Sequence, residues 1–142
     1  GPEYLDGAEI TVPPAARRLM ERFWPGPLTL VLSAPGAFPA ELTGGEVSVA
    51  VRQPGFPVLA RLIAMAGVPL ASTSVNVTGA APLNDPAAIA AAFAGRVECV
   101  VDAGPLPETR PSTIVSFAVD PPTVLREGVL PPDFVRRVLV EG

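Results

Sequence analysis

Prolines and glycines cut the apolar parts of this chain into short segments. The 142 residues include 19 prolines and 13 glycines, while 49% of the chain is hydrophobic. Segments with helical and with extended patterns alternate between these breaks, which is typical of α/β folds. The sequence therefore predicts one α/β domain, residues 1–142, with a twisted mixed parallel and antiparallel sheet flanked by helices.

The expected helices open at a proline, which suits the first helical turn, and end at glycine or before another proline. They are 14–23, 57–66, a helix capped by Asp85 and ended at Gly95, and 132–140. The expected strands are apolar runs or alternating segments. They are 28–32, 47–52, 69–79, 97–101, 112–117 and 124–126.

The segment Pro69–Gly79 combines an apolar start with polar residues at every second position. In an extended strand, Ser72, Ser74, Asn76 and Thr78 share one face. Such a row has two interpretations. It is either the solvated face of a half-buried strand or a row of hydrogen-bonding groups that binds a polar or phosphorylated small molecule.

Missing residue types exclude several kinds of chemistry. All 10 basic residues are arginines, and the chain contains no histidine. A Ser-His-Asp triad, a histidine zinc site, a P-loop lysine and a Schiff-base lysine therefore cannot be built from these residues. Catalysis by positioning and by the charge of arginine remains.

Charge and cysteine content indicate an acidic intracellular protein. The formal net charge is -4, which argues against nucleic-acid binding as the main activity. Cys99 is the only cysteine, so no internal disulfide forms. No apolar run is long enough for a membrane span, and the N-terminus lacks the pattern of a secretory leader. We expect a cytoplasmic protein with no membrane partner.

Candidate binding residues lie on or beside the expected strands. Ligands of open α/β sheets sit beyond strand ends, so one pocket is expected to gather these side chains. The candidates are Ser48, Arg52, Ser72, Ser74, Asn76, Ser112 and Arg126. The ordinary alternative for each arginine is a surface ion pair, and for each serine a strand-end hydroxyl.

Ordered blocks of residues over nearly the whole chain resemble the YrdC/Sua5 family of threonylcarbamoyl-AMP synthases. The blocks are Phe23-Trp24-Pro25-Gly26-Pro27-Leu28-Thr29-Leu30-Val31-Leu32, Val49-Ala50-Val51-Arg52-Gln53-Pro54, Ser74-Val75-Asn76, Val101-Asp102-Ala103-Gly104, Pro111-Ser112-Thr113-Ile114-Val115 and Leu125-Arg126-Glu127-Gly128. Each block alone is unspecific, but their order along the chain makes the match specific.

The resemblance implies an enzyme that joins L-threonine, bicarbonate and ATP into threonylcarbamoyl-AMP and pyrophosphate, for threonylcarbamoyladenosine in tRNA. It implies that Arg52, Ser72 and Ser112 bind L-threonine. The family pattern assigns the ATP contacts to Ser48, Ser74, Asn76, Pro82 and Arg126. No side chain is expected to act as acid, base or nucleophile, and Mg²⁺ is expected to arrive on the ATP phosphates. Asp102 is expected to be a turn residue, and Phe23 and Trp24 to be core residues.

The chain departs from the family pattern in two places. The family's N-terminal segment, with a Lys-x-Arg element that grips ATP, has no counterpart in these residues, and Phe56 replaces a histidine. We therefore expect an N-terminally truncated YrdC-like domain, with impaired activity by itself. Apolar surface and sheet edges left uncovered favour a homo-oligomer.

Two other functions stay open at this point. One is a carbamoyl-transfer module like the YrdC-type module of hydrogenase maturation proteins. The other is a non-catalytic RNA-binding module, which the acidic charge disfavours.

Overall fold

The computed structural model describes residues 2–6, 9–77, 79–104 and 110–140. Within these residues the helices are α1 (Glu3–Asp6), α2 (Pro14–Phe23), α3 (Ala40–Thr43), α4 (Pro57–Ala66), α5 (Pro86–Ala92) and α6 (Pro132–Val140). The strands are β1 (Leu28–Ser33), β2 (Ser48–Val51), β3 (Thr113–Ser116) and β4 (Thr123–Arg126).

The four strands form one mixed sheet in the order β2-β1-β3-β4. β1 is antiparallel to β2 and parallel to β3, and β3 is antiparallel to β4. The two central strands come from distant parts of the chain, so about eighty residues separate β1 from its parallel neighbour. The predicted mixed α/β architecture is confirmed.

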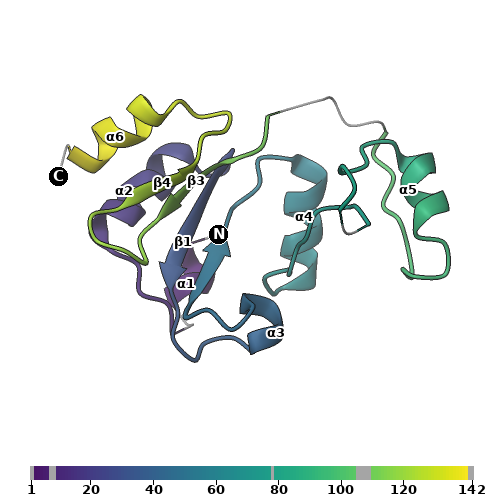
Figure 1. The fold of residues 1–142 in the computed structure, drawn as a ribbon, viewed down its shortest axis with the longest axis horizontal. Coiled ribbons are helices and arrows are strands. Elements are labelled where there is room, and N and C mark those ends of the chain that lie inside the picture. Colours follow the sequence, from purple (N-terminus) through teal and green to yellow (C-terminus); the bar gives the residue numbers. More distant parts are fainter. Residues whose placement is uncertain (1, 7–8, 78, 105–109, 141–142) are drawn as a thin grey trace. The chain divides into compact units, whose positions relative to one another are not determined.

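One face of the sheet carries the core. Leu28, Leu30 and Leu32 alternate along β1 and are fully buried, together with Val115 of β3. α2 and α6 lie against each other on this side of the sheet (Figure 1). α2 adds Ala16, Leu19 and Met20 at helical spacing, and α6 adds Val135. Each leucine buried in this way contributes roughly 1.5–3 kcal/mol to folding.

The opposite face of the sheet carries both polar and apolar side chains. Thr29, Val31 and Ser33 alternate with the buried leucines of β1 and are half-buried. Because cross-strand partners point to the same side, Ile114 of β3 lies on this face beside Thr29. The candidate site is built on this face.

Local signals place the helix starts where the sequence predicts them, whereas α5 ends at Ala92, before the predicted Gly95. α4 begins at Pro57 and ends before Gly67, whose φ of 68° is the left-handed conformation that glycine adopts readily. At α5 the Asp85 carboxylate accepts a hydrogen bond of 2.8 Å from the amide of Ala88. The two short helices α1 and α3 were not expected from the pattern.

The chain divides into two compact units. One contains Gly1–Pro69 and Arg110–Gly142, and therefore the whole sheet; the other is Leu70–Thr109. Among the described residues of the second unit, none is buried. The assignment of residues 1–142 to one domain stays a prediction.

Two predicted strands are wrong. The described residues of 69–79 are irregular, with a bend at Val75 and Asn76 and a turn at Gly79, and Thr78 lies outside the described residues. Here the amide of Leu83 bonds the Val75 carbonyl at 2.8 Å and that of Ala80 bonds Val77 at 2.9 Å, in place of a ladder. Residues 97–101 also form no strand. Alternating residues make a strand only when a neighbouring strand takes up their backbone groups, and none pairs with either segment within the described chain.

The predicted roles of Phe23, Trp24 and Asp102 are confirmed. Phe23 and Trp24 pack against the core, and the Trp24 indole donates to the Leu28 carbonyl at 2.8 Å. The Asp102 carboxylate accepts from the amide of Gly104 at 2.8 Å, which is a turn contact. Over the part of the chain that the structure describes, no helix is both long and apolar enough to cross a membrane.

Candidate functional site

Polar side chains from β1, β4 and the segment before β3 meet on the open face of the sheet. Ser112 directly precedes β3 and is 8% exposed. Its Oγ lies 2.8 Å from Oγ1 of Thr29 and accepts a hydrogen bond of 3.1 Å from Nη2 of Arg126. Nε of Arg126 donates to the Ser112 carbonyl, also at 3.1 Å. Thr29, Ser112 and Arg126 thus form a connected cluster.

A β-bulge aims Arg126 at this cluster. Val124 pairs with Val115 and faces the core, so strict alternation would turn Arg126 to the core as well. The register shifts between Ile114 and Val115, and Arg126 therefore pairs with Ile114 on the open face. Leu125 is the extra residue that produces this shift.

Arg52 enters the same area from the end of β2. It directly follows the strand, and its Nε donates to the Gly26 carbonyl at 2.9 Å. Within the described part of the chain, its two terminal nitrogens have no hydrogen-bond partner. A guanidinium held in this way presents a fork that matches the two oxygens of a carboxylate or phosphate.

The charge of Arg126 lies close enough to Arg52 to affect the Arg52 guanidinium. Burial lowers the pKa of Arg52 below its ordinary value, and the positive charge of Arg126 lowers this pKa further. Among the described residues, neither arginine forms an ion pair with a carboxylate. Guanidinium groups stay charged at neutral pH, so two neighbouring cations without a counterion form a site for an anion.

Contacts with the loop after β4 hold Ser112 in place. Thr113 is fully buried, and its Oγ1 donates to the Leu130 carbonyl at 2.7 Å and accepts from the amides of Gly128 and Leu130 at 3.0 and 3.1 Å. A Cβ at Gly128 would lie 2.4 Å from the Ser112 carbonyl carbon. Only glycine therefore lets this loop pack so closely against the backbone that carries the Ser112 hydroxyl.

The structure places the predicted residues of the sheet unit at two locations. Ser112 and Arg126 are in contact, and Arg52 lies within the reach of the Arg126 charge. Ser48 begins β2 opposite Ser33, four residues from Arg52, and so lies roughly 13 Å away along the strand direction.

The other predicted residues belong to the second unit and are described by themselves. Ser72, Ser74 and Pro82 are exposed, and the Ser74 carbonyl accepts from the amide of Asn76 at 3.1 Å. The Asn76 amide nitrogen donates to the Val77 carbonyl, while its Oδ1 is buried without a partner. It is the only such side-chain atom found in the described residues. A buried acceptor without a donor is costly, so this oxygen is a candidate ligand contact.

Thr29 and Gly128 are site residues that the sequence analysis did not single out. Thr29 lies inside one of the blocks quoted above, and the available signal was a polar residue between two core leucines. Gly128 gave no signal, because the close approach it permits depends on tertiary packing.

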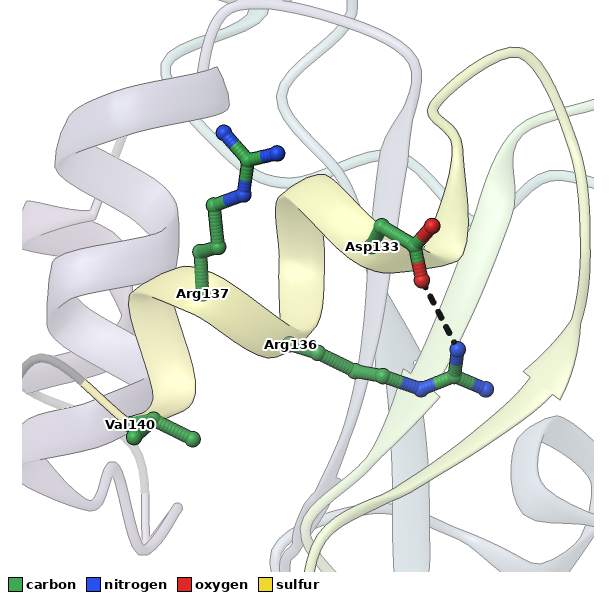
Figure 2. A pocket seen from close by; sticks show the side chains of 4 residues that line it. All are labelled: Asp133, Arg136, Arg137 and Val140. Carbon is green, nitrogen blue, oxygen red and sulfur yellow. Dashed lines mark hydrogen bonds and ion pairs between the residues drawn. The ribbon is translucent and has the colours of Figure 1, made fainter.

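A separate open hollow of about 480 Å³ lies on α6 and is lined by Asp133, Arg136, Arg137 and Val140. Figure 2 shows Arg136 reaching back along the helix to Asp133, with a distance of 3.0 Å between charged atoms. Both side chains are mostly exposed, at 64% and 81%, so this ion pair contributes little to stability. The Arg137 guanidinium lies over the Phe134 ring. These side chains already partner one another and do not form a built binding site.

Comparisons with known proteins point in one direction. Residues 3–128 match the model of the Sua5/YciO/YrdC family, which is described as telomere recombination. A threonylcarbamoyl-AMP synthase of Pyrococcus abyssi is 37% identical over 142 residues, covering 98% of this chain and 41% of the relative. A threonylcarbamoyl-AMP synthase of Bacillus subtilis is 37% identical over 128 residues, covering 89% of this chain and 37% of the relative.

A solved structure supports the same relationship. The crystal structure of P. abyssi Sua5 complexed with L-threonine superposes with a TM-score of 0.88 at 36% identity, covering 98% of this chain and 41% of that one. The present chain thus spans less than half the length of these relatives.

Proposed function

The chain belongs to the Sua5/YciO/YrdC family, and from this membership we propose that it binds L-threonine, bicarbonate and ATP and forms threonylcarbamoyl-AMP with release of pyrophosphate and water. The observation that carries the proposal is a pair of neighbouring arginines that have no carboxylate partner among the described residues, of which Arg126 is hydrogen-bonded to the buried Ser112 hydroxyl. This site suits negatively charged groups, and the carboxylate of the amino acid and the phosphates of the nucleotide are such groups.

Arg52 and Ser112 are proposed to hold L-threonine. The free fork of Arg52 is suited to the planar carboxylate, because its Nε is already fixed on the Gly26 carbonyl and little side-chain freedom is lost on binding. Ser72 is proposed as a third contact. P. abyssi Sua5, which this chain resembles, has been crystallised with L-threonine, and this supports the assignment.

Arg126 is proposed to face the phosphates of ATP. The bulge and the two hydrogen bonds to Ser112 fix its guanidinium, so it can neutralise charge on the departing pyrophosphate without reorganising. Ser48, Ser74, Asn76 and Pro82 are proposed as further ATP contacts, and the unpartnered Oδ1 of Asn76 fits an exocyclic or hydroxyl donor of the nucleotide.

The proposed reaction requires positioning more than side-chain chemistry. The threonine amine adds to bicarbonate with loss of water, and an oxygen of the resulting carbamate attacks the α-phosphorus of ATP. The bond to the β-phosphate oxygen breaks as the new bond forms, and pyrophosphate leaves. Arginines and hydroxyl groups suffice to align these groups and to offset their charge.

Mg²⁺ is proposed to arrive with ATP. In the described residues, no group of three or more His, Cys, Asp or Glu side chains is placed to hold a metal ion. The donor set at the site is cationic and hydroxylic, so a divalent cation there would be held by phosphate oxygens.

The chain is proposed to be a cytoplasmic nucleotidyltransferase. Its product is proposed to be the substrate of a transferase that modifies tRNA. Self-association into a homo-oligomer also stays a prediction, which light scattering of the purified chain would test. A monomer that persists at high concentration would contradict it.

Pyrophosphate release with ATP, L-threonine and bicarbonate tests the proposed function. We expect release that requires all three substrates, from this chain or from a version extended at its N-terminus with the family's Lys-x-Arg segment. Arg52→Gln is expected to weaken threonine binding roughly 10- to 100-fold through loss of a charge-assisted contact. Arg61→Gln, on exposed α4, is the matched control.

Binding of neither ATP nor threonine by calorimetry would overturn the proposal. Turnover of carbamoyl phosphate in place of threonine would indicate the carbamoyl-transfer module, and salt-dependent tRNA binding without turnover would indicate the RNA-binding module.

A further inference from the structure

Thr29 lies between the two arginines of the site, and its side chain does not contribute to the core. It lies in β1 between the buried Leu28 and Leu30 and points to the opposite face. Its partner on β3 is Ile114, which also pairs with Arg126. On the other side, the β1–β2 ladder ends at Leu30–Val51, and Arg52 follows directly. Valine would fill this position with the same shape, so the hydroxyl is the feature that needs a reason.

Hydrogen-bond counting at Ser112 supplies that reason. Its hydroxyl has one proton and two acceptor positions. Arg126 only donates, so it occupies one acceptor position at 3.1 Å. Thr29 is 2.8 Å away, and either hydroxyl can be the donor of that pair. If Ser112 donates to Thr29, its proton is used; if Thr29 donates, the proton of Ser112 stays free.

An anionic ligand selects the second arrangement. Carboxylate and phosphate oxygens accept hydrogen bonds and cannot donate them. A ligand oxygen next to Ser112 therefore needs the Ser112 proton, and the second acceptor position of Ser112 must then be filled by Thr29. The hydroxyls form a directed chain from Thr29 to Ser112 to the ligand, and the Arg126 cation strengthens it by polarising the Ser112 oxygen.

We propose that Thr29 is a positioning residue, whose hydroxyl donates to Ser112 and turns the Ser112 proton toward the bound anion. The inference rests on the proposed function for the identity of that anion, the threonine carboxylate, but its geometric basis is the contact of the two hydroxyls. Ser112 touches the ligand, whereas Thr29 acts through Ser112.

The test first compares three single variants by calorimetry with L-threonine in the presence of ATP. Thr29→Val removes the hydroxyl and keeps the shape, and we expect roughly five- to tenfold weaker binding. Thr29→Ser keeps the hydroxyl and should bind within about twofold of the original protein. Thr123→Val, on the exposed start of β4, is the matched control and should leave binding unchanged.

A double-mutant cycle separates positioning from a structural role. In Ser112→Ala there is no hydroxyl to orient, so adding Thr29→Val should weaken binding no further. A purely structural link between β1 and β3 would lower the melting temperature of Thr29→Val and leave the dissociation constant unchanged. That result, or additive losses in the double variant, would overturn the proposal.

Inorganic pyrophosphate serves as a second probe, so that failure of the proposed function can be distinguished from failure of the role given to Thr29. If threonine does not bind but pyrophosphate does, the amino-acid assignment fails, and the same cycle run with pyrophosphate still tests Thr29. If threonine binds and Thr29→Val binds it equally well, the role of Thr29 fails and the proposed function stands. If neither anion binds, both are overturned.

Discussion

Thr113 shows how one buried hydroxyl can determine the position of a neighbouring site residue. Its Oγ1 bonds three backbone groups of the loop after β4, while the adjacent Ser112 faces the other side of the sheet. The same short segment therefore anchors the loop with one residue and presents the site hydroxyl with the next. This division follows from the alternation of side chains along an extended backbone.

Replacing Thr113 by valine is expected to destabilise the protein by about 2–3 kcal/mol, because the amides of Gly128 and Leu130 lose their buried acceptor. Urea denaturation measures this change as a lower midpoint. Thr123→Val is the control: Thr123 Oγ1 makes one exposed bond of 3.1 Å to Pro121, and its loss should stay within about 0.5 kcal/mol. Equal effects at the two positions would contradict the role given to Thr113.

At the scale of elements, β4 differs from a regular strand by one residue. The extra residue Leu125 lets Val124 face the core and Arg126 face the site, an arrangement that strict alternation forbids. A bulge beside a site is a known way to redirect a side chain. The position of Arg126 is therefore a property of the pairing between β3 and β4.

α5 depends on its N-cap, because none of its residues is buried. Asp85→Ala removes the acceptor for the Ala88 amide and should destabilise the helix by about 1 kcal/mol. Hydrogen exchange by NMR would then show the amides of Ile89 and Phe93 exchanging about fivefold faster. Asn also caps helices well, so Asp85→Asn should change these rates by less than about twofold. Unchanged exchange in Asp85→Ala would show that the cap is not important for α5.

At the scale of the whole molecule, burial is distributed unequally between the two units. The sheet unit contains the buried core, whereas the described residues of 70–109 are all exposed or half-buried. Local stability follows buried apolar contacts, so the two units are expected to open with different free energies. Several proposed ligand contacts, Ser72, Ser74 and Asn76, belong to the less buried unit.

Hydrogen exchange with mass spectrometry should show fast exchange over residues 70–77 and slow exchange over β1 and β3 in the free protein. Adding ATP with L-threonine should slow exchange at 72–76 if these residues contact ligand, while α6 serves as the internal control. Protection of 72–76 equal to that of β1 without ligand would contradict the burial seen in the structure.

Local patterns in the sequence predicted most elements within one or two residues. Proline at the first turn and glycine past the end locate α4, and Asp85-Pro86 locates the start of α5. The apolar run 28–32 predicts the strand β1, and the structure shows that its leucines alternate toward the core. These signals are local because helix caps and side-chain alternation depend on the few residues next to them.

Strand formation in 69–79 and 97–101 was predicted wrongly, because a strand depends on partners that a local pattern does not contain. The register that brings Arg126 to Ser112, the hydroxyl contact of Thr29, and the close approach at Gly128 were likewise beyond local reasoning. The residue types in the chain thus set which chemistry is available. Without histidine or lysine, an anion site is built here from arginines and hydroxyl groups. Pairing between distant strands decided which of those side chains meet, because contacts across a sheet are set by long-range register.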